Sequence, residues 1–585
     1  MAKISNANYG EKTREDLVWY VILVLAVLVA AGVRLYDLDL KSLSHPEIYI
    51  PGIDLRPGIS EPPPRTGFVE NLWWHFHFEP HPMGWYLAMF GWTSIAGTSE
   101  WALRFPSVIF AAASVPVAFA ISRRIFGPAA AALMAVMIAL HGFHYFWSQN
   151  ARMYTAGMFL ALLSTWQLIR LTQSPVPRLT QEVAYVLCIV AGTQTVELFW
   201  PFLAIQMAWA ALVFADSRQV TPSRLMSAGA MASPRILQVQ AIGLMLSAPG
   251  ISHALYHARN GAVSDPTLLF AQEYLSFGFL FAHHEFSYPE RHIAQPLAYL
   301  LLVAALVLIV AGLGQIRKPH ESARASNAPL PAWLAPITAV VVAALMIWLA
   351  SIAHHRAKAM YVAAVLPLLV LGVPRLALAA KAVLVRVFPQ TDTWIARLNA
   401  PALLVALLGI LTPMVLFAAS YAVTVNAARA FLLFVPFLLM LCAAGAVGII
   451  QSTVGRLALS AAVIVIFALS IPYNATAPIS PRDYKEIASQ IRSQMKPGDL
   501  FFVKPQDWVY TPLFYYLPEV EYVTEDYVNV ANSHPDARVW LIDWPGVGGT
   551  VSVGVRPEDF RGRKRIATVT ALRARAELFV SEAAP

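Results

Sequence analysis

Charged residues and cysteines are both scarce in this chain of 585 residues. Asp, Glu, Lys and Arg together make up 13% of it, whereas hydrophobic residues make up 58%. A composition this apolar excludes a water-soluble globular protein. The two cysteines, Cys188 and Cys442, both lie in apolar stretches. They therefore exclude a disulfide framework and a cysteine-based zinc site.

What the chain has instead is a succession of long apolar runs. A helix needs about 20 residues to cross the hydrocarbon core of a bilayer. By this measure the runs predict about thirteen transmembrane helices, and the protein is expected to be an α-helical polytopic membrane protein. Their approximate ranges are 17–36, 105–122, 128–147, 153–171, 183–198, 200–215, 236–251, 295–314, 332–352, 359–375, 401–420, 430–450 and 457–472.

The loops between these runs differ in their content of basic residues. Alternate loops are rich in Arg and Lys, as at Arg123 and Arg124 or at Arg317 and Lys318. Cytoplasmic loops carry such an excess, so the pattern predicts a multi-pass protein of the plasma (inner) membrane with a cytoplasmic N-terminus. Topology also explains the net charge of +8, and no nucleic-acid partner is expected.

The loop at residues 37–104 is predicted to lie outside the cell and combines acidic with aromatic residues. Its segment 82–96 is apolar but short and contains glycine, which favours an interfacial helix over a membrane span. A loop of this kind suggests chemistry at the outer face of the membrane. Its acidic residues include Glu47, Asp54, Glu61, Glu70 and Glu79.

The apolar pattern ends near residue 472. Residues 481–507 read as an amphipathic helix, a Pro-Gly-Asp turn and a strand, and further strands are expected at 537–544 and 566–580. The sequence therefore predicts two domains. Residues 1–472 form a transmembrane module, and residues 473–585 form a small extracytoplasmic α/β domain.

The few cations of the predicted outer loops stand at the edge of the membrane. Ionisable groups there are costly and usually face a cavity or a partner. A guanidinium pairs bidentately with phosphate, so this set favours an anionic lipid head group as ligand. Interfacial snorkelling is the alternative. The set includes Arg104, Arg152, Arg356, Lys358 and Arg429.

Glu47 lies in the segment HPEIYIP, directly after the first apolar run. A carboxylate here could take the proton of an acceptor hydroxyl that attacks a sugar, while nearby cations stabilise a leaving phosphate. Histidines are also present, as in His75-Phe-His77 and His283-His284-Glu285. Because neither spacing suits a metal site and no HExxH motif occurs, no metal or other cofactor is expected.

Several segments together resemble the GT-C membrane glycosyltransferases, most of all family 39 and its relatives. These relatives are the protein O-mannosyltransferases, the lipid A aminoarabinose transferase and the bacterial lipopolysaccharide-sugar transferases. The resemblance extends over nearly the whole chain. It is carried by HPM before an aromatic helix, GTSE…LRFPS, ISRRIFGPAAAALMAVMIAL, SQNARMYT, NAARAFLLFVPFLLMLCAAG and the tail segment DYKEIASQIRSQMKPGDLFFV.

The resemblance assigns roles to individual residues. Glu47 falls on the second acid of the family's Asp-Glu pair, and Pro46 stands where the first acid is usual. The base is therefore Glu47, or else Asp54 or Glu79. Residues expected to bind the donor phosphate are His81, which falls near a basic position of the family, Arg152 and Tyr154 of its Arg-x-Tyr element, and the outer cations Arg104, Arg356, Lys358 and Arg429.

The implied activity is the inverting transfer of a sugar from a polyprenyl-phosphate donor at the outer face of the membrane. The acceptor would be a hydroxyl or phosphate of a lipid, glycan or protein. Two alternatives stay open from the sequence: a transporter or flippase of a lipid-linked sugar, and a non-catalytic scaffold for envelope assembly. A transporter more often shows paired halves with helices broken at matching positions, and no such repeat is evident here.

Overall fold

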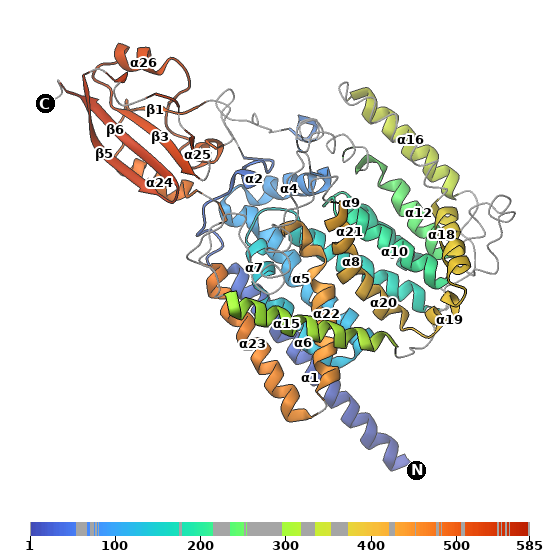
Figure 1. Ribbon diagram of the computed structural model, residues 1–585. Helices are drawn as coiled ribbons and strands as arrows, with labels where there is room; N and C mark the ends of the chain where they lie inside the picture. Colours follow the sequence, from blue (N-terminus) through green and yellow to red (C-terminus); the bar gives the residue numbers. More distant parts are fainter. Residues whose placement is uncertain are drawn as a thin grey trace.

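The computed structural model describes residues 2–53, 67–70, 75, 79, 81–174, 178–214, 234–250, 253, 295–317, 334–352, 373–419, 428–450, 452–475, 479–480, 482–504, 509–546, 549–551, 553–555, 559–560 and 562–582. In this part of the chain a large helical body is followed by a small mixed sheet (Figure 1). The predicted class, a mostly helical protein with a small C-terminal sheet domain, is confirmed. The exact domain boundary stays a prediction.

Helices make up the body up to residue 475. In the first half they are α1 (Ala2–Leu35), α2 (His45–Ile48), α4 (Met83–Ala96), α5 (Glu100–Phe126), α6 (Pro128–Leu140), α7 (Gly142–Ser148), α8 (Tyr154–Gln173), α9 (Leu179–Thr193), α10 (Phe199–Phe214) and α12 (Arg235–Leu246). In the second half they are α15 (Gln295–Leu313), α16 (Leu334–Ile352), α18 (Val373–Val387), α19 (Thr391–Ala396), α20 (Ala400–Ala406), α21 (Thr412–Ala419), α22 (Val435–Ile449) and α23 (Thr453–Ala475).

Three helices in the described ranges are long and apolar enough to cross a membrane: Asp16–Leu35, Glu100–Phe126 and Phe431–Ile449. A fourth is counted if α6 and α7, which meet at an angle of 50°, form one broken span. Most other predicted runs coincide with shorter apolar helices, and 359–375 lies largely outside the described residues. The number of about thirteen spans therefore stays a prediction.

Helix α5 lies at the centre of the body and packs against α1, α6 and α8. Its ends carry strong signals, since the Ser99 hydroxyl accepts from the backbone of Ala102 and Gly127 follows the last turn with φ of +91°. Such a polar N-cap and a glycine in the left-handed region define helix ends. The N-terminal part of α5 carries Arg104, which contacts Glu47 of α2, and Glu100, which contacts Lys485 and Tyr516 of the C-terminal domain.

The bend between α6 and α7 is held by a buried arginine from α1. Arg34 donates to the carbonyl oxygen of Ala139 at 2.7 Å and to that of Ile138 at 3.3 Å. These carbonyls end α6 and have no partner of their own within the helix, so a cation is favourable there. The single predicted run at 128–147 is thus two helices, because Arg34 takes up the backbone groups released at the bend.

Two other helices, α15 and α22, approach each other unusually closely. A Cβ atom on Gly445 would overlap the carbonyl oxygen of Leu308, and one on Gly312 would overlap that of Leu441. Small residues at such crossings let helix backbones pack directly in a membrane protein. This contact fixes α22 in the core of the body.

The C-terminal domain is a sheet with helices beside it. Its strands have the order β2-β1-β3-β6-β5, and β4 pairs with β3; β1 is parallel to β2 and β3, while β6 is antiparallel to β3 and β5. The predicted helix, turn and strand after residue 481 are found as α24 and β1. The elements are α24 (Tyr484–Arg492), β1 (Leu500–Phe502), α25 (Thr511–Tyr516), β2 (Tyr522–Val523), α26 (Tyr527–Ser533), β3 (Val539–Gly546), β4 (Gly549–Val551), β5 (Arg563–Ala571) and β6 (Ala574–Ser581).

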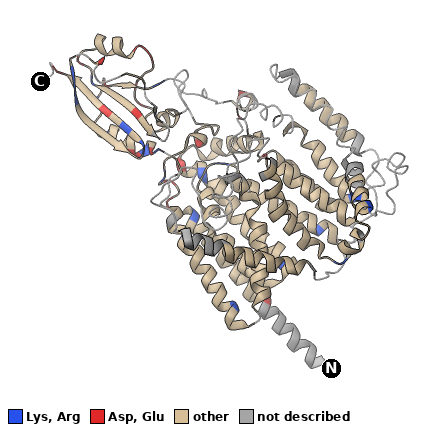
Figure 2. Ribbon diagram, viewed as in Figure 1, with Lys and Arg blue, Asp and Glu red and all other residues tan. Residues whose placement is uncertain are grey.

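Charged residues are distributed unevenly over this architecture. Figure 2 shows that they are sparse along the helices of the body and gather where the body meets the C-terminal domain. This is also where residues 38–47, between α1 and the end of α2, contact α24 and α25. The first loop and the C-terminal domain therefore lie on the same side of the helical body.

Candidate functional site

Glu47 belongs to the four-residue helix α2. Ser44 precedes this helix, and Glu47 Oε2 accepts from the backbone N of Ser44 at 2.8 Å and from its hydroxyl at 3.0 Å. The Glu47 carboxylate thus caps the backbone N–H of the residue before its helix, as in a capping box, and Pro46 at the start of the helix favours the same conformation. Pro46, which replaces the expected acid, therefore helps to form the turn that orients Glu47.

Both oxygens of Glu47 are fully engaged, and the residue is completely buried. Oε1 accepts from Arg104 Nε at 3.0 Å and from the backbone N of Ala151 at 2.9 Å. Oε2 accepts from Arg104 Nη2 at 3.3 Å in addition to the two donors of Ser44. A carboxylate offers about four lone-pair positions, so these donors leave no room for a further proton donor.

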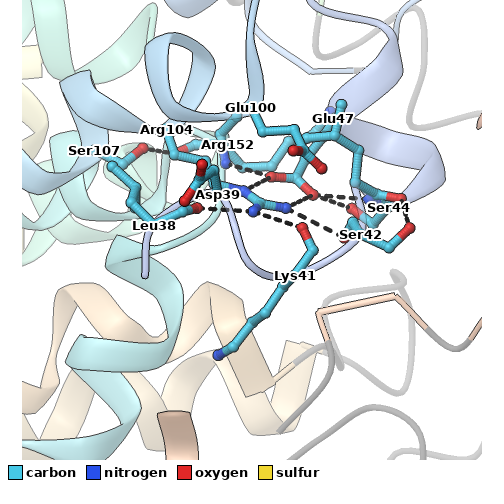
Figure 3. A network of polar contacts seen from close by, with 12 residues as sticks. Leu38, Asp39, Lys41, Ser42, Ser44, Glu47, Glu100, Arg104, Ser107 and Arg152 are labelled. Atoms are coloured by element: carbon cyan, nitrogen blue, oxygen red, sulfur yellow. Dashed lines mark hydrogen bonds and ion pairs between the residues drawn. The ribbon is translucent and has the colours of Figure 1, made fainter. Parts of the chain in front are cut away.

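The N–H groups of Arg104 likewise all donate to acceptors within the protein. Beyond its two bonds to Glu47, it donates to the carbonyl oxygens of Leu38, Lys41 and Ser42, at 3.0, 2.8 and 3.2 Å (Figure 3). A guanidinium has five N–H groups, and each of them has an acceptor here. In this arrangement Arg104 fixes the first loop and has no donor left for a phosphate.

A second cluster of polar side chains lies beyond Pro46. Arg152 Nη1 donates to the carbonyl oxygen of Pro46 at 3.0 Å and to the Tyr86 hydroxyl at 2.7 Å. Glu79 lies near the Tyr86 hydroxyl and acts on its pKa. Arg152 Nε is buried and has no hydrogen-bond partner among the described residues. The guanidinium therefore keeps a donor that an anionic or oxygen-bearing group could use.

Two carboxylates, Glu79 and Glu197, also belong to this cluster. His81 lies between them, with Nδ1 2.6 Å from Glu197 Oε1 and Nε2 3.9 Å from Glu79 Oε1. Glu79 is nearly buried, whereas a quarter of the His81 side chain is exposed. We call Glu79, His81, Tyr86, Arg152 and Glu197 the outer-loop cluster. It joins the segment before α4, helix α4 itself, the turn before α8 and the turn before α10.

Electrostatics fix the protonation of two members of this cluster. Burial raises the pKa of Tyr86 well above its usual value, and Glu79 raises it further against the opposing effect of Arg152. The phenol therefore stays protonated beside Glu79. Burial alone would lower the pKa of Arg152, but Tyr86, Tyr154 and Glu79 outweigh it, and the pKa is raised. Arg152 is a permanent cation.

The predicted site residues thus divide into groups. Glu47 and Arg104 form one buried pair, and Glu79, His81 and Arg152 meet in the outer-loop cluster. Tyr154 is buried beside Trp147, with ring centroids 5.0 Å apart. Asp54, Arg356 and Lys358 lie outside the described residues, as does the side chain of Arg429, whose backbone belongs to the 3₁₀ turn Ala428–Leu433.

Two members of the cluster were not predicted as site residues. In the sequence Tyr86 belongs to the predicted interfacial helix at 82–96, where aromatic residues are common. Glu197 stands alone in the apolar stretch QTVELFW, and an isolated acid in such a stretch is itself a functional signal. Across the described residues, no group of three or more His, Cys, Asp or Glu side chains is arranged to hold a metal ion.

Residues 79–233 match the model of the family described as dolichyl-phosphate-mannose-protein mannosyltransferase. The predicted resemblance to GT-C glycosyltransferases is confirmed. The expected enzyme class, a glycosyltransferase, is confirmed with it. All five residues of the outer-loop cluster lie within the matched stretch. The match therefore covers the part of the chain in which this geometry is found.

Solved structures offer further likenesses at low identity. The crystal structure of ArnT from Cupriavidus metallidurans bound to undecaprenyl phosphate is 14% identical, with a TM-score of 0.39, and the alignment covers 95% of this chain and 97% of that one. The oligosaccharyltransferase AglB from Archaeoglobus fulgidus, in complex with an inhibitory peptide and a dolichol-phosphate, is 12% identical with a TM-score of 0.43, covering 88% and 65%. No curated protein sequence matches the chain.

Proposed function

We propose that this protein transfers a sugar, with inversion, from a polyprenyl-phosphate donor to an acceptor hydroxyl or phosphate at the outer face of the plasma membrane. The acceptor is a lipid, a glycan or a protein. The observation that carries the proposal is the outer-loop cluster, in which a carboxylate, a partly exposed histidine and a buried arginine meet within the family-matched stretch.

The cluster supplies the two functions that this reaction needs. A carboxylate takes the proton of the acceptor hydroxyl as its oxygen bonds to the anomeric carbon. The bond from that carbon to the phosphate oxygen breaks, and the polyprenyl phosphate leaves with the electron pair. Cations beside the leaving phosphate stabilise its growing charge. No strong general acid is needed, because phosphate is already a good leaving group.

Among the acids predicted as the base, Glu79 fits the described geometry best. A base needs a lone pair that can reach a substrate proton, and the oxygens of Glu47 already accept five hydrogen bonds. Glu79 instead lies beside the partly exposed His81 and near the Tyr86 hydroxyl. We therefore assign proton abstraction to Glu79 and the orientation of the first loop to Glu47.

The donor phosphate is assigned to the cations of the cluster. Arg152 has an Nε without a hydrogen-bond partner among the described residues, and a quarter of the His81 side chain is exposed. Arg356, Lys358 and Arg429, which the sequence places in outer loops, are proposed to complete the phosphate site. Because the first loop and the C-terminal domain share one side of the body, we place both outside the cell and the N-terminus in the cytoplasm.

The test is sugar transfer in vitro from a defined polyprenyl-phosphate sugar. Glu79→Gln is expected to lower kcat by about 10²- to 10⁴-fold, the usual contribution of a general base, while the KM for the donor changes little. Glu70→Gln is the matched control, because Glu70 belongs to the same loop, is exposed and, among the described residues, hydrogen-bonds the backbone N of Gly67. It should keep wild-type kcat.

Other outcomes discriminate between the candidates. If Glu47→Gln loses transfer while its melting temperature is unchanged, and Glu79→Gln stays active, Glu47 is the base. Equal activity of Glu47→Gln, Asp54→Asn and Glu79→Gln removes the base from this loop. Movement of the lipid-linked sugar across vesicle membranes without any transfer supports a flippase, and neither activity supports an assembly scaffold.

A further inference from the structure

We propose that the C-terminal domain holds the first loop in its active conformation, with Tyr516 and Lys485 as positioning residues for sugar transfer. This inference rests on the proposed function and extends it to a domain outside the family-matched stretch. The segment concerned is residues 38–47, which ends in Glu47. We call it the acidic segment.

Tyr516, at the end of α25, connects three parts of the chain through one hydroxyl group. The hydroxyl accepts from the backbone N of Leu43 at 2.7 Å and donates to Glu100 Oε1 at 2.5 Å. Leu43 belongs to the acidic segment, and Glu100 is in the first turn of α5. Burial, together with Glu100, raises the pKa of Tyr516, so the phenol keeps its proton and this bridge persists at physiological pH.

Lys485 and Ser42 form a second attachment beside the first. Lys485 Nζ donates to Glu100 Oε2 at 2.6 Å and to the carbonyl oxygen of Asp39 at 2.6 Å. The Ser42 hydroxyl accepts from the backbone N of Tyr484 at 3.1 Å and of Lys485 at 3.3 Å. These are among the first N–H groups of α24, which have no acceptor within their own helix. A loop residue thus caps a helix of the C-terminal domain.

On its other side the acidic segment is held by the helical body. Arg104 binds the carbonyl oxygens of Leu38, Lys41 and Ser42 (Figure 3). The segment is therefore held on one side by the buried Arg104 of the helical body and on the other by the C-terminal domain. Removing either set of partners leaves its backbone groups without acceptors or donors.

The acidic segment leads directly to the proposed catalytic groups. The carbonyl oxygen of Pro46 accepts from Arg152, which also donates to Tyr86, and Tyr86 lies near Glu79. The segment held by Tyr516 thus contacts the residues that surround the proposed base. Because a misplacement of about 1 Å at a reacting group can cost on the order of 100-fold in rate, loosening the segment should affect catalysis without touching substrate.

The experiment compares two adjacent tyrosines. Tyr516→Phe keeps the ring and removes both hydrogen bonds, whereas Tyr515→Phe removes a bond from the same helix to the carbonyl oxygen of Thr98, outside the acidic segment. We expect Tyr516→Phe to lower kcat by about 10- to 100-fold, with the donor KM unchanged. Ser42→Ala, which breaks the second attachment, should act in the same direction. Tyr515→Phe should resemble wild type.

Hydrogen–deuterium exchange gives a readout that does not depend on activity. In the full-length Tyr516→Phe variant the amides of residues 38–47 should exchange faster than in wild type, and in Tyr515→Phe they should not. Unchanged exchange in both Tyr516→Phe and Ser42→Ala overturns the positioning role, whatever the activity. Faster exchange with unchanged kcat also overturns it. Absence of transfer by the wild-type protein overturns the proposed function instead, and with it the catalytic part of this inference.

Discussion

Arg104 Nε lies 3.0 Å from Glu47 Oε1, and neither side chain is exposed to solvent. The two residues are 57 positions apart in the sequence, one in α5 and the other in α2. A buried ion pair of this kind contributes little relative to an apolar pair, but losing one partner leaves a buried charge uncompensated. The pair therefore makes α2 dependent on α5.

We predict that Arg104→Met is strongly destabilising, by about 3–5 kcal/mol, the usual cost of breaking a buried pair. Thermal unfolding of the purified protein in detergent measures this. Arg124→Met is the control, since Arg124 is exposed near the other end of the same helix and bonds Gln173. The double variant Arg104→Met/Glu47→Gln should be less destabilised than the sum of its parts. If the losses of stability of the two single variants simply add up in the double variant, Arg104 and Glu47 are not directly coupled.

Gly84 allows α4 to approach the end of α9. Its backbone N donates to the carbonyl oxygen of Gln194 at 2.8 Å, and a Cβ atom at this position would come within 2.5 Å of the same oxygen. Gly84→Ala must therefore displace the first turn of α4, which carries Tyr86 of the outer-loop cluster.

We expect Gly84→Ala to lower transfer activity at least tenfold, and to cost about 1–3 kcal/mol of stability through overpacking. The matched control is Gly91→Ala in the same helix, where no atom lies within 4 Å of the added Cβ. That variant should keep its activity and gain slightly in stability, because alanine favours helix more than glycine does. If the two variants have equal kcat, the position of α4 does not set the geometry of the cluster.

The C-terminal domain should show a defined response to acid. Burial alone would raise the pKa of Asp499, but hydrogen bonds from Arg538, the backbone of Lys496 and Trp540 outweigh it and lower the pKa. In the ion pair with Arg538, Nη2 of the arginine lies 2.6 Å from Asp499 Oδ2. A carboxyl group whose pKa is lower in the folded state stabilises the fold above its unfolded pKa, and this contribution is lost as pH falls through the folded value.

Asp499→Asn should therefore lower the melting temperature of the C-terminal domain clearly at pH 7, and the difference from wild type should shrink below about pH 4, where unfolded aspartate is protonated. Melting of the full-length protein at several pH values measures the difference. Glu525→Gln, at an exposed position of the same domain, should show almost no effect at any pH. A difference that does not change with pH would rule out the charge of Asp499 as its origin.

Much of the fold is predictable because apolar runs and end signals are local. Helix α5 is an example, since Ser99 and Gly127 mark its ends next to an apolar run. The bend between α6 and α7 is not, because residues 128–147 read as one apolar run long enough to span the membrane. Its cause is Arg34, whose partner Ala139 is 105 residues away.

The candidate site also has features that local sequence predicts and features that depend on distant contacts. Motifs pointed to Glu47, Glu79, His81 and Arg152, but which acid keeps an open lone pair depends on contacts between distant residues. Glu47 has the more suggestive sequence context, and its burial comes from Arg104 and Ala151, neither of which is near it in the chain. Glu197 reaches His81 across 116 residues. Such pairings have no local signature.

The attachment of the acidic segment also fixes when the site can be completed during synthesis. Leu43 leaves the ribosome well before Tyr516, whose hydroxyl accepts its N–H group and which follows 473 residues later. Tyr484, whose backbone N donates to the Ser42 hydroxyl, is synthesised 442 residues after Ser42. Domains generally form in the order in which they are made, so the helical body is inserted in the membrane with this segment incompletely held. Completion of the site therefore waits until the C-terminal domain has folded and contacted the loop that was synthesised before it.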